Sequence, residues 1–307
     1  MAISESVSCR KVKRRKKLST EDKVFYVFIY TFFALFAIVI AFPLIHILAL
    51  SLNERYDAVL GGIYLLPREW SLDNYRIILE EHPGFISGAV CTVARTLIGT
   101  FTGLVADTFL AYILSRRKFL FKSGLSLFWI IAMFIHGSII PIVPVIILYR
   151  HLHLVRSFWV YIIPGMVNVV YVMAMRTYMQ NIPDSLEESS QLEGAGYIRV
   201  FWSIISPLCK PLYASVALFI AAYHWNSWVD TLCYNRLDQE YTTMPFELVK
   251  FFLELRYQGQ NMFRGRAYTP AAVVAAATVL AMLPILVISP FFQKYYVSGL
   301  KIGGIKE

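Results

Sequence analysis

Long apolar runs separated by short polar segments dominate the pattern along this chain. Five runs contain no Asp, Glu, Lys or Arg: residues 24–53, 123–149, 157–175, 211–229 and 267–293. A sixth run, residues 85–115, is interrupted only by Arg95 and Asp107. A hydrocarbon core about 30 Å thick needs about 20 apolar helical residues to cross it. The pattern therefore predicts an all-α polytopic membrane protein with six transmembrane helices.

The composition agrees with a membrane environment, since the chain of 307 residues is 57% hydrophobic and only 16% charged. The first apolar run is about twice as long as the hydrophobic region of a signal peptide, and no small-residue cleavage site follows it. This favours a retained helix over a cleaved secretory signal. Prolines inside the runs are typical of kinked helices that open and close, although transmembrane helices in general carry more proline than soluble ones.

The distribution of Lys and Arg predicts the orientation. With the N-terminus inside, 18 of these residues lie on the cytoplasmic side and 10 on the other, leaving out Arg95 within a span. This asymmetry places both termini in the cytoplasm. The basic run at residues 10–17 could contact nucleic acid, but beside a transmembrane helix it more often fixes orientation and touches anionic lipid. We expect contact with membrane lipid and no nucleic-acid partner.

The charge pattern also divides the chain. Residues 1–20 form a basic cytoplasmic tail, and residues 21–307 form a single transmembrane domain. Two polar stretches, residues 54–84 and 231–268, are expected to be extracellular loops. The second is long enough that a function is more plausible than an idle connection.

Motifs for chemistry are absent from the chain. The four cysteines have no C-x-x-C spacing, and no ligand set surrounds His136, so we expect no metal site. No H-E-x-x-H or G-x-S-x-G motif is present, which argues against a membrane-embedded enzyme. No phosphate-binding loop of the G-x-x-x-x-G-K-[ST] type occurs either, so no nucleotide is held by that device. We predict no catalytic residue and no cofactor in this chain.

A polar, helix-forming segment, residues 183–208, interrupts the apolar pattern between spans 4 and 5. Pro183 is a good start for a helix, and Glu187 and Glu188 lie in its first turns, where the helix macrodipole favours acids. Gly194 and a second glycine two residues later end or bend this helix. A second amphipathic helix then leads to span 5. We expect an element along the cytoplasmic face that contacts another protein.

This segment resembles the EAA loop of the inner-membrane permeases of ABC importers. That pattern is Glu-Ala-Ala, three residues, Gly, nine residues, Ile, one residue and Leu-Pro, and Glu188, Gly194, Ile204 and Pro207 stand at those spacings. Serines replace the two alanines and the leucine, and the first two changes exchange small residues for small ones. The resemblance implies a coupling helix that docks on a cytoplasmic ATPase. The residues expected to make this coupling site are Glu187, Glu188, Ser189, Ser190, Glu193, Gly194, Ala195, Ile204 and Pro207.

The resemblance extends from about Asp22 to Lys306. Four segments look like the carbohydrate branch, in particular the permeases of complex oligosaccharide systems related to the inner subunit of the maltose transporter: residues 67–75, 175–177, 224–228 and 290–296. The resemblance implies a passive translocation subunit of a binding-protein-dependent importer. Its partners would be a second homologous permease, two cytoplasmic ATPase subunits that hold ATP and Mg, and an extracellular solute-binding protein. An alternative is a secondary transporter working alone, which predicts internal repeats, and no convincing repeat is visible.

Candidate substrate contacts gather at the outer end of span 5. At helical spacing they occupy two adjacent faces, with His224, Ser227, Trp228 and Thr231 on one and Tyr223, Asn226 and Asp230 on the other. Polar side chains at membrane depth face a cavity or a partner helix, and aromatic rings could stack on sugars. The alternative is that the tryptophans belong to the interfacial aromatic belt and that the polar groups bond to neighbouring helices.

Arg95 is the remaining candidate for the substrate path. A charge in the middle of a span costs about 2.5 to 3.5 kcal/mol in lipid, so both Arg95 and Asp107 should point into protein or water. Arg95 could attract an acidic glycan, or it could anchor a contact between helices. Asp107 lies twelve residues further along the same span, too far for an ion pair within one helix.

Overall fold

The computed structural model describes residues 19–116, 119, 121–135, 141–258 and 270–304. These residues form helices and connecting segments without a β-strand, and their one isolated β-bridge joins Asn53 to Trp70. The all-helical prediction is confirmed. The longest helices are α1 (Thr20–Ser51), α4 (Pro83–Ser115), α11 (Lys210–Asn226) and α13 (Pro270–Gly304).

Helix α4 lies at the centre of the bundle, packed against α7 (Val169–Gln180), α11 and α12 (Met244–Gln258). At the crossing with α11, a Cβ added to Gly99 would collide with the imidazole of His224, so this residue allows the two helices to approach. Between α4, α7 and the start of α11 lies an apolar core that includes Ala111, Leu114, Val172, Met175, Met179, Val200, Ile205, Cys209 and Ile220.

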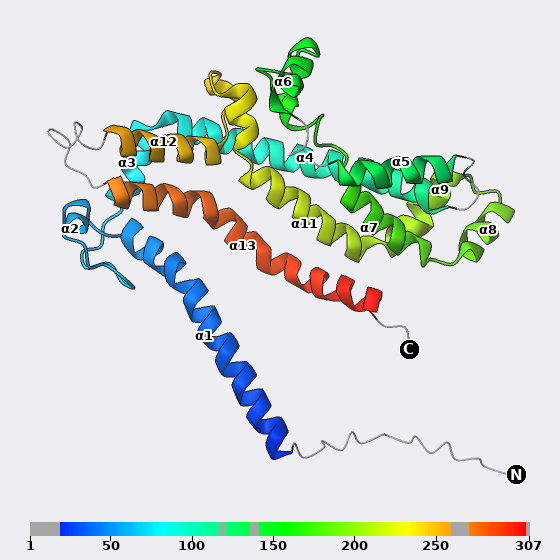
Figure 1. Cartoon of the computed structure of the whole chain (residues 1–307), viewed down its shortest axis with the longest axis horizontal. Helices are drawn as coiled ribbons and strands as arrows, with labels where there is room; N and C mark the ends of the chain where they lie inside the picture. The colour runs from blue at the N-terminus through cyan, green and yellow to red at the C-terminus, as the bar shows by residue number, and fades with distance from the viewer. Residues whose placement is uncertain (1–18, 117–118, 120, 136–140, 259–269, 305–307) are drawn as a thin grey trace, which may run out of the picture.

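The bundle has two distinct ends (Figure 1). At one end lie α8 (Asp184–Leu192) and α9 (Tyr197–Val200). At the other end lie α2 (Arg55–Val59), α3 (Asp73–Glu81) and α12. Because α4 begins beside α3 and runs toward α8, it connects the two ends of the molecule directly.

Helix α1 begins away from the bundle and meets it only near its C-terminal end (Figure 1). The helix begins at a capping box in which the backbone N–H of Ser19 donates to Asp22 Oδ2 at 3.1 Å. Near its C-terminal end a small apolar cluster ties it to α2 and α13 through Ala49, Ala58, Ile63 and Ala272. Most of its remaining side chains are exposed. Such an apolar helix requires lipid or another protein around it.

The six predicted spans appear in part as single helices. Among the described residues, three helices are long and apolar enough to cross a membrane: Thr20–Ser51, Pro83–Ser115 and Ala271–Phe291. Residues Tyr197–Leu208 and Lys210–Asn226 form a bent pair with an angle of 83°, which adds a fourth if the pair is one span. The expected first, second and sixth spans therefore correspond to continuous helices.

Spans 3 and 4 are not continuous helices. In place of span 3 are α5 (Lys122–Phe134) and α6 (Ile142–His151). Span 4 starts as the short helix η1 (Phe158–Tyr161), passes through an irregular stretch containing Pro164 and Gly165, and becomes helical again at α7. Proline lacks the backbone N–H that helix continuation needs, and Asn168 caps the restart by accepting from Val170 N at 3.0 Å.

The two stretches predicted as extracellular loops contain short helices. Residues 54–84 include α2 and α3, and residues 231–268 include η3 (Thr231–Asn235), η4 (Gln239–Tyr241) and α12. Residues 259–268 of the second loop and residues 1–18 of the basic tail lie outside the described residues. The division of the chain into tail, membrane domain and loops stays a prediction.

Candidate functional site

The polar segment between spans 4 and 5 forms two helices joined by a glycine turn. After α8, Gly194 has a φ of +87°, a conformation that favours glycine. The turn is closed by hydrogen bonds from Gly194 N to Gln191 O at 3.0 Å and from Ala195 N to Ser190 O at 2.9 Å. The chain then runs through α9, η2 (Phe201–Ile205) and α10 (Ser206–Leu208) into α11. The expected order of helix, glycine turn and helix is present.

The residues of the EAA-like pattern divide between an outer and an inner side. Exposed side chains include the acidic Glu188 and Glu193 and the neighbouring Leu192, which is 90% exposed. Ser189, Gly194 and Pro207 are also exposed, and Ser190 is half-buried. On the inner side, Ala195 and Ile204 pack against the apolar core between α4 and α7, and Glu187 is buried. Spacing alone did not distinguish these two sides.

The end of α11 differs from the expected continuous helix. The helix ends at Asn226, because the next residue, Ser227, has the extended backbone angles φ −72° and ψ 127°. The prediction that Ser227, Trp228 and Thr231 continue one face of the helix that carries His224 is therefore wrong. Asn226 bonds within its own helix, donating to Ala222 O at 2.8 Å.

Arg95 is fully buried and paired with a residue from beyond the end of α11. Its Nη2 lies 2.5 Å from Asp230 Oδ2, and its Nη1 donates to Ser227 O at 3.3 Å. The guanidinium also lies over the ring of Tyr161, 4.4 Å from the ring centre. A cation held between a carboxylate and an aromatic face satisfies its charge within the protein. This geometry corresponds to the helix-anchor interpretation of Arg95.

Further polar contacts extend this anchor toward α12. The hydroxyl of Tyr161 donates to Tyr241 O at 2.5 Å and lies 3.1 Å from Thr231 Oγ1. The hydroxyls of Thr231 and Thr243 lie 2.8 Å apart. The backbone N–H of Met244 then donates to Thr92 Oγ1 on α4 at 2.9 Å. Buried networks of satisfied polar groups rigidify the elements that they join. The segment after α11 is thus fastened to α4.

A cavity of about 170 Å³ lies between α4, the start of α7 and α11. It is lined by Tyr223 and His224, two of the predicted path residues, together with Tyr171, Asn168 and Asp107. Asp107 is 1% exposed, and its Oδ1 accepts from the backbone N–H of Asn168 at 2.8 Å. Tyr171 and Asn168 were missed from the sequence because α7 restarts in the middle of an apolar run. The cavity offers aromatic rings, a carboxylate and an imidazole, groups able to contact sugar hydroxyls.

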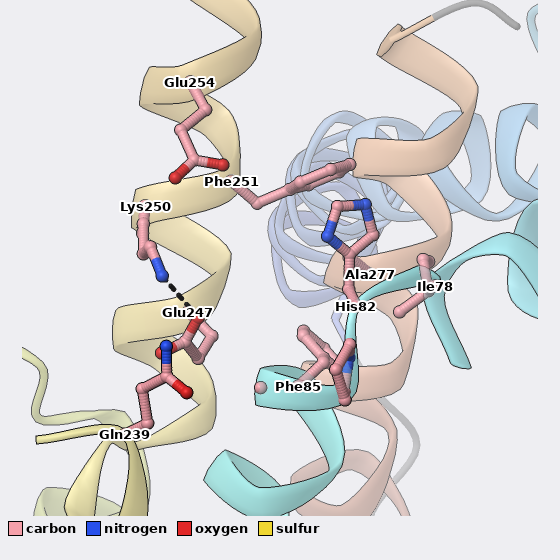
Figure 2. Close-up of a pocket in the computed structure, with 11 residues that line it drawn as sticks. Ile78, His82, Phe85, Gln239, Glu247, Lys250, Phe251, Glu254 and Ala277 are labelled. Carbon is pink, nitrogen blue, oxygen red and sulfur yellow. Dashed lines mark ion pairs between the residues drawn. The ribbon is translucent and has the colours of Figure 1, made fainter. Parts of the chain in front are cut away.

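A second cavity, of about 210 Å³, opens between α12 and the start of α4 (Figure 2). Figure 2 shows Glu247, Lys250 and Phe251 of α12 facing His82 and Phe85 across it. The rings of His82 and Phe251 meet edge to face at 4.6 Å, and Lys250 Nζ lies 3.5 Å from Glu247 Oε2. The Glu247 carboxylate lies beside the first turn of α4, where the helix macrodipole favours an anion. This arrangement fixes α12 to the N-terminal end of α4.

Trp225 adds a contact that the sequence did not predict in detail. Its indole Nε1 donates to the backbone oxygen of Ala281 on α13 at 2.9 Å. The bond agrees with the interpretation of polar groups in this region as links between helices. No group of three or more His, Cys, Asp or Glu that could hold a metal ion occurs among the described residues.

Comparison with known proteins gives relatives along nearly the whole chain, although no family model matches. The chain is 29% identical over 288 residues to the polygalacturonan/rhamnogalacturonan transport system permease protein YtcP of Bacillus subtilis, covering 93% of this chain and 99% of that protein. It is 26% identical over 290 residues to the arabinooligosaccharides transport system permease protein AraQ of the same bacterium, covering 94% and 98%.

A solved structure shares the fold. It is a bacterial ABC transporter involved in the import of the acidic polysaccharide alginate, with a TM-score of 0.81 and 23% sequence identity, covering 91% of this chain and 99% of that chain. YtcP and AraQ are both named as transport system permease proteins, and the similarity covers nearly their full length. Similarity over nearly the whole chain, together with the shared fold, supports a permease subunit of a sugar ABC importer.

Proposed function

We propose that this chain is the passive translocation subunit of a binding-protein-dependent importer and forms half of the path for an oligosaccharide. The observation that carries the proposal is similarity over more than 90% of the chain to permeases of oligosaccharide systems. The chemistry of ATP hydrolysis is assigned to separate ATPase subunits, which hold ATP and Mg. A different, homologous permease completes the pore as a heterodimer, and a solute-binding protein delivers the sugar.

The exposed side of α8 is proposed as the surface that docks on the ATPase. It presents Glu188, Leu192 and Glu193 at one end of the bundle, before the turn at Gly194. An apolar side chain ringed by carboxylates suits insertion into a cleft with basic walls. This placement makes the α8 end cytoplasmic. The N-terminal end of α1 and the C-terminal end of α13 both lie away from the α3 end, which supports cytoplasmic chain termini in a multi-pass protein of the cell membrane (Figure 1).

The opposite end, formed by α3 and α12, is then extracellular and is proposed to receive the binding protein. Within the membrane, the cavity beside Asp107 is proposed as part of the sugar path, with Tyr171 and Tyr223 offering aromatic faces. Tyr223 is 58% exposed and so remains available to a ligand or to the second permease. Arg95 and Asp230 are proposed to hold the helices around this path in position without contacting the sugar, because their charges neutralise each other.

Reversal of the charge at Glu188 tests the docking surface. We expect Glu188→Lys to release the ATPase subunits during purification, or to abolish sugar-stimulated ATP hydrolysis, because a like charge facing basic walls costs several kcal/mol. Glu69→Lys is the matched control, since Glu69 is also exposed but its backbone oxygen accepts from Glu54 N at 2.7 Å beside α2, at the end of the bundle away from α8. Normal ATPase binding and normal stimulated hydrolysis in Glu188→Lys would contradict the proposed docking surface.

A further inference from the structure

Arg116, the residue directly after α4, binds the helix α8 from behind. Its Nη1 lies 3.3 Å from Glu187 Oε2 and 3.6 Å from Asp184 Oδ1, both on α8. Its Nη2 donates to the backbone oxygen of Met179, near the end of α7, at 3.0 Å. Its Nε donates to Ser115 Oγ at 3.1 Å, which orients the guanidinium. One side chain therefore joins the ends of α4 and α7 to α8.

This contact is enclosed by the protein. The side chains of Arg116 and Glu187 are each 8% exposed, whereas those of the surface pair Arg76 and Glu80 are 73% and 61% exposed. Burial removes both charges from water, and this desolvation cost offsets much of the attraction between them. An apolar pair of similar size often stabilises a protein to the same extent. What a buried pair with fixed hydrogen bonds does provide is a defined geometry between the elements that it joins.

Glu187 is also the point at which α8 is held. Among the residues of α8, all of which the structure describes, Glu187 is the only buried one. Gln191, one turn later, donates to Glu187 Oε1 at 3.3 Å and so supports the carboxylate from its own helix. On the far side, Leu192 projects into solvent. A force applied by a partner to the exposed side of α8 is therefore transmitted to the bundle through the contact of Glu187 with Arg116, or through the residues that connect α8 to its neighbours in the chain.

Helix α4 contacts elements at both ends of the molecule and can therefore transmit a movement of α8 to the other end. At the Arg116 end it contacts α8 and α7, and further along it holds the buried Arg95 and Asp230 pair. Its first turn lies beside Glu247 on α12. A helix is stiff along its axis, so a displacement at one end moves the other.

We infer that Arg116 is a positioning residue that converts movement of α8 into movement of α4, with Glu187 as its partner. This inference rests on the proposed coupling role of α8. The inference assigns different roles to the adjacent acids Glu187 and Glu188. Glu188 faces outward toward the ATPase, and Glu187 faces inward and transmits the motion.

Arg116→Met in the complete transporter is the first test. Met retains an unbranched apolar stem, but it removes both ion pairs and the bond to Met179. In proteoliposomes we expect the ATPase subunits to remain bound and ATP hydrolysis to stay within about twofold of wild type. Sugar uptake should fall at least about tenfold, so that more ATP is hydrolysed for each sugar carried. Tenfold corresponds to about 1.4 kcal/mol of lost coupling, within the usual range for linked sites.

Two further variants separate coupling from folding. Arg116→Lys keeps the charge near Glu187 but not the forked geometry, and it should recover part of the uptake. Glu187→Gln keeps the shape of the side chain and removes its charge, and it should shift the ratio of ATP to sugar in the same direction as Arg116→Met. Arg156→Met removes the exposed pair of Arg156 with Asp238, which lies on none of α3, α8 and α12, and it should leave that ratio unchanged.

The outcomes distinguish this inference from the proposed function. A wild-type ratio of ATP to sugar in both Arg116→Lys and Glu187→Gln, together with reduced amounts of folded complex for Arg116→Met, would show that Arg116 only stabilises the fold and would overturn the inference. A coupled wild-type transporter would leave the proposed function standing in that case. Failure of wild-type protein to bind any ATPase would overturn both.

Discussion

Replacement of Arg95 by Met should destabilise the protein strongly, although the change lies outside the proposed ATPase contact. The Arg95 side chain is fully buried, lies 2.5 Å from Asp230 Oδ2 and covers the ring of Tyr161 at 4.4 Å. Removal of one partner from a buried pair costs about 3–5 kcal/mol, because the other charge stays behind without compensation. Asp230 keeps 19% of its side chain exposed, so water reaches it in part. We therefore expect a loss near the lower end, about 3 kcal/mol.

The assay is thermal unfolding of the purified protein in detergent, followed by tryptophan fluorescence at a fixed heating rate. For a chain of this size, each 1 kcal/mol lowers the unfolding midpoint by about 2–4 °C, so Arg95→Met should lower it by about 6–12 °C. Arg76→Met is the control, because the exposed pair of Arg76 with Glu80 contributes only about 0.3–0.5 kcal/mol. The double variant Arg95→Met with Asp230→Asn should recover part of the loss, since it leaves no charge unpaired.

An equal midpoint for Arg95→Met and Arg76→Met would refute this reasoning. It would mean that the environment of Arg95 is wet, as in an open channel, and that the pair is not an anchor. A midpoint for the double variant below that of Arg95→Met would also contradict the argument, because the unpaired carboxylate would then not be the source of the cost.

Two further predictions concern the helix crossings around α4. Gly99→Ala should destabilise the protein by about 1–3 kcal/mol, because the new methyl group collides with the ring of His224; Gly124→Ala, which meets no atom within 4 Å, should have no such cost in the same unfolding assay. Asp107→Leu should cost about 1–3 kcal/mol by leaving the backbone N–H of Asn168 without its acceptor, whereas Asp107→Asn keeps an oxygen there and should unfold near the wild-type midpoint. Equal midpoints within either matched pair would show that the contact in question contributes nothing.

The apolar pattern predicted the long helices well, because length and hydropathy are sufficient for a continuous span. Helices α1, α4 and α13 follow the expected first, second and sixth spans closely. One failure has a helix-breaking residue inside an apolar run: η1 and α7 are separated by a stretch with Pro164 and Gly165. Hydropathy does not register such breaks, and helices that end within a membrane protein can be satisfied by neighbours such as Asp107.

The sequence predicted the secondary structure of the candidate site but not which of its side chains are buried. The polar segment at residues 183–208 correctly predicted a helix, a glycine turn and a second helix. It did not reveal that Glu187 is buried against Arg116, because that partner is 71 residues earlier in the chain. Likewise, the pair between Arg95 and Asp230 joins residues 135 apart. Such long-range contacts are set by packing of the helices and leave no local periodicity.

Uptake by the reconstituted transporter tests the central claim most directly. The chain would be purified with the proteins that accompany it, placed in liposomes, and supplied with the solute-binding protein and labelled oligosaccharides, including uronate-containing ones because YtcP is named for polygalacturonan and rhamnogalacturonan transport. We predict uptake that requires internal ATP, the ATPase subunits and a second, different permease. Uptake by this chain alone without ATP would contradict the account.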